Sequence, residues 1–173
     1  MMVIYVVTTG GTIEKTYSER TGSVKNLSNK IEGYLQPLRL PDSEVNIVPV
    51  LNKDSLEMTD ADRELILATV RGLLNENAPI IITHGTDTMV QTGLLLKRKL
   101  PDFKVPIVLT GAMAPLGFEA SDGLQNLTES LFAVRLLCPG IYVVMHNQAF
   151  SIDRVRKDKE LGMFVTTSQN GLK

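Results

Sequence analysis

Residues 1–14 read MMVIYVVTTGGTIE, an apolar run that ends in two glycines and a threonine. Residues 3–7 are continuous and rich in β-branched side chains, the pattern of a strand buried on both faces of a parallel sheet. Gly10 and Gly11 permit backbone angles closed to other residues, so a ligand can lie there against bare peptide N–H groups. Thr12 then presents a hydroxyl. A tight turn with Thr12 as a helix cap would give the same string; a phosphate loop is disfavoured, because no GxGxxG or Lys-Ser/Thr pattern is present.

Apolar runs and amphipathic stretches alternate along the rest of the chain. Strands are expected over residues 44–50 (ending at Pro49 or just after it), 79–83, 105–109 and 141–145. Helices are expected over residues 30–38, 59–75 and 121–137, with a further helix that follows residue 88 and ends near residue 100. This alternation predicts an α/β fold: one domain over residues 1–173, doubly wound (flavodoxin- or Rossmann-like), with a mainly parallel sheet in the order 2-1-3-4-5 and helices on both faces.

One stretch breaks the alternation. Residues 14–29 are polar, with Tyr17 as the only aromatic side chain. Long loops inside compact domains often act as functional lids. We therefore expect a long mobile loop here, beside the Gly-Gly-Thr turn.

Composition excludes several classes of protein. Lys and Arg number 18 against 19 Asp and Glu, a net charge of −1, so no basic field favours nucleic acid. Cys138 is the only cysteine, which excludes an intrachain disulfide, and its apolar neighbours predict a small buried core residue. Residues 1–7 have no basic flank and are too short an apolar run for a signal peptide or membrane span. A cytoplasmic protein with no membrane or nucleic-acid partner is expected.

Hydroxyls and small residues follow four of the predicted strands. An alcohol is a poor nucleophile at neutral pH and needs a base or a lowered pKa, so a threonine nucleophile should have partners. Lys157, Tyr17 and the pair Thr86 and Asp87 are the available candidates. The loops that the topology brings to the carboxyl edge of the sheet are TTGGT at 8–12, NKDSLEM at 52–58, HGTDT at 84–88 and TGAMAP at 110–115.

These strings resemble a known family. The chain is similar to the bacterial-type L-asparaginases, threonine amidohydrolases that release ammonia from asparagine, and the resemblance spans nearly the whole chain. Asparaginases of this type have a second, C-terminal α/β domain, so the 173 residues resemble a short, single-domain form. The motifs that carry the resemblance are TGGTI at 9–13, DSLEM at 54–58, HGTDTM at 84–89, GAMAP at 111–115, SDGLQNL at 121–127 and the stretch 144–157.

The resemblance implies a role for each matching residue. Thr12 matches the nucleophile that forms an acyl-enzyme, and Tyr17 the lid tyrosine that activates or positions it. Thr86, Asp87 and Lys157 match a second group, in which the lysine polarises the threonine hydroxyl and orders the attacking water. The N–H groups of Thr12 and Thr86 are candidate oxyanion donors. Which threonine attacks first is left open.

The resemblance also implies a substrate pocket. Asp87 resembles the residue that takes the α-ammonium of asparagine, and Ser55 with nearby N–H groups would take the α-carboxylate. Close backbone approach is expected at three small residues, Gly11, Gly85 and Ala112. No cofactor or metal is implied, since hydrolysis through a hydroxyl needs neither.

Structural roles remain open for several of these residues. Thr86 and Asp87 are also placed to cap a helix, and Ser55 to form an ordinary turn. Lys157 lies in a charged run over residues 153–160, which is typical of a solvated face. Other polar residues are expected to play supporting parts: His84 as a strand-end histidine held by hydrogen bonds, and Asp122 and Asn126 as the start of a helix, with Asp122 able to orient the TGAMAP loop.

The absence of a second domain predicts dependence on neighbours. A pocket that lacks the residues of a second domain should rely on the lid, residues 14–29, and on a partner subunit. We therefore expect a homo-oligomer. Asparagine is preferred over glutamine as the substrate, although one methylene is worth only roughly 1–3 kcal/mol of discrimination. The alternatives are an amidase for glutamine or another small amide, and a noncatalytic amino-acid sensor of the same fold.

Overall fold

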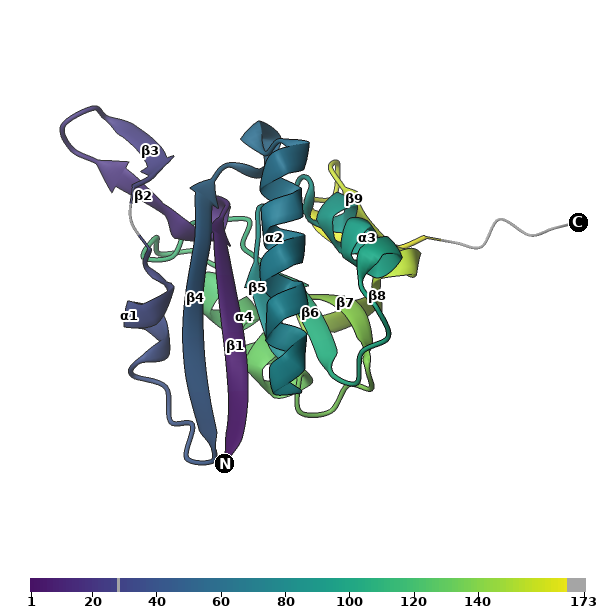
Figure 1. The fold of residues 1–173 in the computed structure, drawn as a ribbon. Helices are drawn as coiled ribbons and strands as arrows, with labels where there is room; N and C mark the ends of the chain where they lie inside the picture. Colours follow the sequence, from purple (N-terminus) through teal and green to yellow (C-terminus); the bar gives the residue numbers. More distant parts are fainter. Residues whose placement is uncertain (28, 168–173) are drawn as a thin grey trace, which may run out of the picture.

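The computed structural model describes residues 1–27 and 29–167; residue 28 of the predicted loop and the last six residues of the predicted domain lie outside the described part. A six-stranded sheet occupies the centre, with helices against both of its faces (Figure 1). Its strands in chain order are β1 (Met2–Gly10), β4 (Ser43–Lys53), β5 (Ile80–Thr83), β6 (Pro106–Thr110), β7 (Gly140–Met145) and β8 (Gln148–Ser151).

The strand order is β4-β1-β5-β6-β7-β8. The first five strands are parallel and reproduce the predicted order 2-1-3-4-5, so the doubly wound fold class is confirmed. The sixth, β8, pairs antiparallel with β7 and was not expected. His146 and Asn147 join the two strands with φ of 52° and 60°, the paired left-handed conformation of a tight hairpin turn.

Four helices flank the sheet, namely α1 (Ile31–Leu35), α2 (Asp60–Leu73), α3 (Met89–Lys99) and α4 (Gly123–Ala133). Three of them, α1, α2 and α4, are shorter than expected, whereas α3 ends next to residue 100, as predicted. Thr59 caps α2 as predicted, in a reciprocal capping box with Asp62. Among the described residues, no helix combines the length and apolar character needed to cross a membrane.

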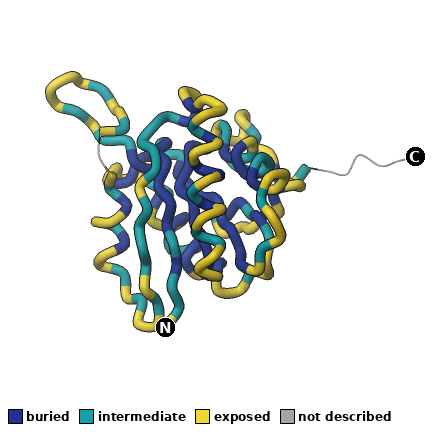
Figure 2. The backbone as a smooth tube through the Cα atoms, viewed as in Figure 1, coloured by how far each residue is buried: buried dark blue, intermediate teal, exposed yellow. Residues whose placement is uncertain are grey.

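The core lies in two layers, one on each face of the sheet. Ile80 and Ile82 of β5 pack in the layer under α2 and α3, whereas Ile81 between them packs in the layer under α4. All three are fully buried, which explains the unbroken apolar runs of the central strands. Figure 2 shows this buried centre beneath the more exposed helices and loops.

In the stretch 14–29, the described residues 14–27 do not form one long loop, as the sequence predicted, but include two strands. After a short 3-10 turn, η1 (Thr12–Glu14), the chain forms an antiparallel hairpin from β2 (Lys15–Ser18) and β3 (Ser23–Asn26). Tyr17 lies opposite Val24 in this hairpin, a cross-strand pair of residues that favour strands. The β2–β3 hairpin projects from the body of the molecule at the upper left of Figure 1.

Two smaller expectations were also wrong, and one charged stretch has more structure than the sequence indicated. The second predicted strand continues past Pro49 to Lys53, because β4 has a paired neighbour on one side only and an edge strand tolerates proline. Cys138 is exposed rather than buried, since it lies in the surface connection between α4 and β7. The charged run at 153–160 contains a strand, β9 (Val155–Asp158), which pairs with β10 (Met163–Thr166).

Candidate active site

Four loops meet at the carboxyl edge of the sheet. The strands β1, β4, β5 and β6 run parallel there, with Thr83 between Thr8 and Thr110. The register of β1 against β4 shifts between Thr8 and Gly10, so that Gly10 lies opposite Lys53. Each strand therefore delivers its following loop to the same edge, as predicted for a doubly wound sheet. The loop after β1 carries Thr12, which is partly exposed.

Small residues allow three of these loops to touch. A Cβ atom on Gly11, which has a φ of 78°, would lie 2.4 Å from the backbone nitrogen of Gly85. A Cβ atom on Gly85 would in turn lie 2.4 Å from Ser55 Oγ. Any larger residue at position 11 or 85 would force the loops apart. The contacts of Gly11 with Gly85 and of Gly85 with Ser55 therefore let the loops after β1, β5 and β4 lie against one another.

A second cluster joins the loop after β5 to the β9–β10 hairpin. Lys157 Nζ on β9 donates to Thr86 Oγ1 at 2.7 Å and to Asp87 Oδ1 at 2.8 Å. Thr86 is buried, and the lysine side chain is 17% exposed. Buried Val155 and Phe164 fix the hairpin to the core and so aim Lys157 at the loop. Lys157 therefore does not belong to a solvated face.

The capping alternatives do not account for the threonines. Thr88 occupies the cap position of α3, so Thr86 and Asp87 lie outside the helix, and neither caps it. Gly11 occupies the corresponding position of η1, and Thr12 is already the first residue of that turn. The hydroxyls of Thr12 and Thr86 are therefore available for contacts other than helix capping.

Ser55 lies buried at this edge of the sheet, in the 3-10 turn η2 (Ser55–Glu57) that follows β4. It is 1% exposed, and among the described residues its Oγ atom has no hydrogen-bond partner. The turn is fixed by Asp54, which accepts the Leu56 N–H at 3.0 Å and an ion pair from Lys15 at 2.5 Å. Burial opposes the ionisation of Asp54, but these two contacts hold its pKa below the ordinary value. A buried hydroxyl without a partner is costly to the stability of the fold.

The turn that carries Thr12 is held from several sides. Gly11 N–H donates to the Lys53 carbonyl at 2.8 Å, and Asn26 Nδ2 on β3 donates to the Gly11 carbonyl at 2.8 Å. Below the turn, Glu14 Oε2 accepts the Gly10 N–H at 3.0 Å. Neither Asn26 nor Glu14 was expected from the sequence, because both lie in the polar stretch of residues 14–29.

Two predicted residues stand apart from these contacts. Tyr17 is 53% exposed on the β2–β3 hairpin, and the structure does not bring it into the Lys157 cluster. Ala112 is 1% exposed in the loop after β6 and packs in the core layer under α4. It supports the loop rather than presenting a side chain to the edge.

The loop after β6 is oriented by α4, as predicted. Asp122 accepts the N–H groups of Met113 and Ala114 at 2.9 and 3.0 Å, and His146 Nε2 lies 2.7 Å from its other oxygen. Although burial opposes ionisation, the two N–H groups keep the pKa of Asp122 below its ordinary value. Asn126 Nδ2 donates to the Gly111 carbonyl at 2.9 Å, so both helix residues hold the loop.

His84 is the strand-end histidine that the sequence predicted. It is fully buried, with Nδ1 2.9 Å from the Gly85 carbonyl oxygen and Nε2 2.8 Å from Thr92 Oγ1. Burial lowers its pKa to about 4, so the ring is neutral at physiological pH. Both ring nitrogens have protein partners, and the ring ties β5 to α3.

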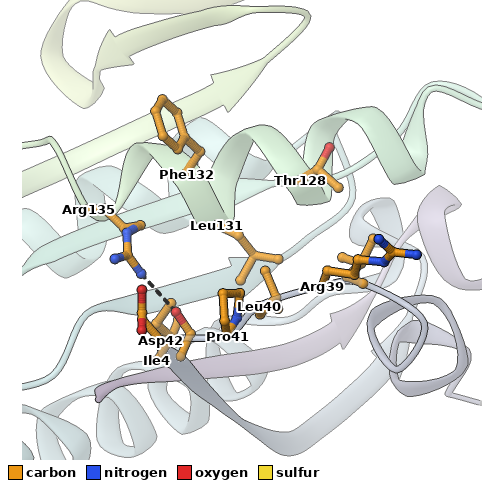
Figure 3. A pocket seen from close by; sticks show the side chains of 11 residues that line it. Ile4, Arg39, Leu40, Pro41, Asp42, Thr128, Leu131, Phe132 and Arg135 are labelled. Carbon is orange, nitrogen blue, oxygen red and sulfur yellow. Dashed lines mark hydrogen bonds between the residues drawn. The ribbon is translucent and has the colours of Figure 1, made fainter.

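A separate pocket lies at the opposite end of the sheet. Its volume is about 330 Å³, and it opens between α4 and the connection that precedes β4 (Figure 3). Ile4 and Ser43 lie near the beginnings of β1 and β4, and Arg135 donates to Ser43 Oγ at 2.9 Å. The pocket is therefore remote from the carboxyl edge. Within the described ranges, no group of three or more His, Cys, Asp or Glu could hold a metal ion.

Comparisons with known proteins agree with this architecture. L-asparaginase of Thermococcus kodakarensis is 34% identical over 170 residues, 98% of this chain and 52% of that protein, and L-asparaginase 1 of Escherichia coli strain K12 is 28% identical over 174 residues, 96% of this chain and 51% of that protein. One subunit of the glutamyl-tRNA(Gln) amidotransferase of Methanosphaera stadtmanae is 32% identical over 143 residues, 82% of this chain and 32% of that protein.

Solved structures show the same similarity. The T. kodakarensis L-asparaginase superposes with a TM-score of 0.86 at 33% identity, over 95% of this chain and 51% of that one. L-asparaginase I of Vibrio cholerae gives 0.79 at 27% identity, with the same coverage. The chain thus spans about half the length of these relatives. The family model described as "Asparaginase, N-terminal" matches residues 3–170, and the chain belongs to the asparaginase family.

Proposed function

We propose that the protein is an amidohydrolase that converts L-asparagine to L-aspartate and ammonia, with Thr12 as nucleophile. The observation that carries the proposal is the cluster of Lys157, Thr86 and Asp87, joined at 2.7 and 2.8 Å. Its loop touches the turn that presents Thr12 through the contact of Gly85 with Gly11. A lysine that donates to a buried threonine hydroxyl is not needed for simple ligand binding, which disfavours the noncatalytic sensor. The proposal takes residues 1–173 as one domain of the asparaginase N-terminal type.

The reaction proceeds in two steps. Thr12 Oγ1 attacks the side-chain amide carbon; the hydroxyl proton passes to the amide nitrogen, the C–N bond breaks and ammonia leaves. Water then attacks the resulting ester, which releases aspartate and returns the proton to Thr12. Lys157 polarises the Thr86 hydroxyl, and together they order the attacking water.

The loop backbones supply the electrostatic part. Oxyanion donors are assigned to the N–H groups of Thr12 and Thr86, which follow the touching residues Gly11 and Gly85. Such donors aim at charge that develops in the transition state, and removing one typically costs about 100- to 1000-fold in rate. The close contact of the two glycines keeps both donors in one fixed arrangement.

Substrate recognition uses two polar side chains. Ser55 Oγ, buried and without a partner among the described residues, donates to the α-carboxylate. Asp87, 32% exposed at its side chain, accepts from the α-ammonium while it also holds Lys157. Tyr17 is assigned the activation of Thr12, which requires the β2–β3 hairpin to close over the turn. A partner copy in a homo-oligomer completes the pocket.

A second amide substrate is the alternative. The similarity to a glutamyl-tRNA(Gln) amidotransferase subunit favours it, because the name of that relative refers to glutamyl-tRNA(Gln) rather than to free asparagine. Glutamine differs from asparagine by one methylene, so a pocket can discriminate between them by only roughly 1–3 kcal/mol. The two candidates differ in the preferred amide and share the nucleophile.

Ammonia release from asparagine, glutamine, D-asparagine and other small amides tests the proposal directly. We expect turnover of asparagine that falls roughly 1000-fold or more in Thr12→Ala, while calorimetry shows that asparagine still binds. Thr128→Ala, which removes a threonine hydroxyl on α4 beside the remote pocket, is the matched control and should keep full activity. No ammonia from any amide, or an undiminished rate in Thr12→Ala, would refute the mechanism.

A further inference from the structure

Glu14 has no part in the chemistry above, yet it lies two residues after Thr12. Its side chain is fully buried. One carboxyl oxygen, Oε2, accepts the Gly10 N–H at 3.0 Å, and the other, Oε1, has no hydrogen-bond partner among the described residues. Glutamate is almost never fully buried without a compensating partner, so this placement calls for a reason.

The group that Glu14 holds is the start of the Gly-Gly-Thr turn. Gly10 has a φ of 95°, and a Cβ atom there would lie 2.4 Å from the Lys53 backbone nitrogen. Gly11 is equally tight against Gly85. The turn is therefore wedged between β4 and the loop after β5, and a displacement of Gly10 passes through the backbone to Thr12.

We propose that Glu14 is the positioning residue of this turn: its carboxyl group fixes the Gly10 N–H and thereby sets the place of the Thr12 hydroxyl and N–H. This inference rests on the proposed function, in which Thr12 is the nucleophile. Glu14 does not touch the substrate and acts through the backbone of residues 10–12.

The charge of Glu14 changes near neutral pH. Burial raises its pKa from 4.5 to about 7, against the opposing effects of the Gly10 N–H, the Lys30 backbone N–H and the Lys30 charge. Lys30 is the one charged side chain among the described residues that acts on Glu14, and its Nζ atom donates instead to the carbonyls of Lys15 and Leu116 at 2.6 and 2.9 Å. The hydrogen bond between Glu14 and Gly10 therefore varies with pH, and the ionised form places a negative charge against the Gly10 N–H, two residues before Thr12.

Nuclear magnetic resonance tests the hydrogen bond between Glu14 and the Gly10 N–H without an activity assay. In uniformly ¹⁵N-labelled protein, the Gly10 amide resonance should shift with a midpoint near pH 7 and remain unchanged with pH in Glu14→Gln, which keeps an acceptor oxygen and cannot ionise. Glu129→Gln is the matched control, since Glu129 also accepts a backbone N–H, from Asn147 at 2.7 Å, and it should leave the Gly10 titration intact. A Gly10 amide that does not titrate in the wild type, or titrates equally in Glu14→Gln, overturns the proposal.

Kinetics test the consequence for Thr12. Glu14→Leu removes the acceptor and should lower kcat for asparagine roughly tenfold with KM within about twofold, because the turn is misplaced while the pocket floor is kept. The ratio of kcat in Glu14→Gln to that in the wild type should be constant below pH 6 and rise roughly three- to tenfold above pH 7, since only the wild type gains the charge.

The outcomes separate the two proposals. An unchanged kcat in Glu14→Leu, or a kcat ratio for Glu14→Gln that is flat with pH, refutes the positioning role even if asparagine is the substrate. Should Glu14→Leu not fold, the Glu14→Gln ratio and the Gly10 titration decide alone. A wild-type protein that releases no ammonia from any amide refutes the proposed function, whereas the Gly10 titration still decides whether Glu14 controls the turn.

Discussion

Lys157 donates a 2.7 Å hydrogen bond to Thr86 although 71 residues separate the two in the sequence. The contact joins two different structural units, the loop after β5 and the β9–β10 hairpin. Because Asp87 accepts from the same ammonium at 2.8 Å, the lysine is held at two points and has little freedom to turn away. Any role in catalysis therefore depends on the hairpin as much as on the parallel sheet.

Replacing Lys157 by methionine should lower kcat for asparagine roughly 100- to 1000-fold, because the Thr86 hydroxyl loses the group that polarises it. KM should stay within about threefold, since the floor at Ser55 is unchanged. Steady-state ammonia release measures both. Lys159→Met, a change to an exposed lysine two residues away, is the control. A fully active Lys157→Met would remove the lysine from the mechanism and leave Thr12 in place.

Replacing Ser55 by alanine should separate stability from binding. The hydroxyl is buried without a partner among the described residues, so its removal should raise the free energy of unfolding by about 1 kcal/mol. The same change should raise KM for asparagine roughly tenfold, because a hydrogen bond to a charged carboxylate is lost. Urea unfolding and steady-state kinetics measure the two effects. Ser151→Ala on β8 should alter neither; a destabilised Ser55→Ala with normal KM would contradict the assignment.

Replacing Gly85 by alanine should destabilise the protein by roughly 1–3 kcal/mol, because the added Cβ atom would lie 2.5 Å from Ser55 Cβ. Adding Ser55→Gly should recover much of the loss, whereas adding Ser55→Ala should not, since the clashing Cβ atom remains. Thermal unfolding of the single and double variants measures the coupling. Equal stability of the two double variants would show that the loops adjust in another way.

Stability should respond to pH through two buried groups with opposite signs. Between pH 4.5 and about 7 the folded protein keeps a proton on Glu14 that the unfolded chain has released, so the free energy of unfolding falls as pH rises. Between pH 6.5 and about 4 the unfolded chain protonates His84 while the folded protein does not, so the free energy falls as pH drops. The two effects oppose each other where the windows overlap.

Glu14→Gln isolates the first effect. Its free energy of unfolding relative to the wild type should increase by roughly 3 kcal/mol between pH 4.5 and 7.5, at about 1.4 kcal/mol for each pH unit of the window. Urea unfolding across this range, with Glu129→Gln alongside, makes the comparison. Wild-type and Glu14→Gln curves that stay parallel would show that Glu14 is already ionised in the folded protein at pH 5.

The parallel sheet was predictable because its signals are local. Unbroken apolar runs such as residues 79–83 and capping residues such as Thr59 determine elements without reference to the rest of the chain. The strand order also followed, since alternating strands and helices leave few topologies. Asp122 was predictable for the same reason, as it begins a helix just after the loop that it orients.

The hairpins were harder to predict because their strands have four residues each and draw stability from pairing. Nothing local in residues 155–158 indicates a strand, and the position of Lys157 depends on buried Phe164 across the hairpin. Glu14 was missed for a different reason: a single acidic residue in a polar stretch is normally solvated. Only the packing of the Gly10 turn over it shows that it is buried.

Pro49 has a consequence for how copies of the chain can associate. It lies exposed in β4, the long strand at one edge of the sheet, where it offers no N–H to an incoming strand. At the other edge β8 has only four residues. Both edges are thus poor templates for strand addition, which guards the protein against sheet-to-sheet aggregation, and we expect any stable assembly of copies to form through helical or loop surfaces instead.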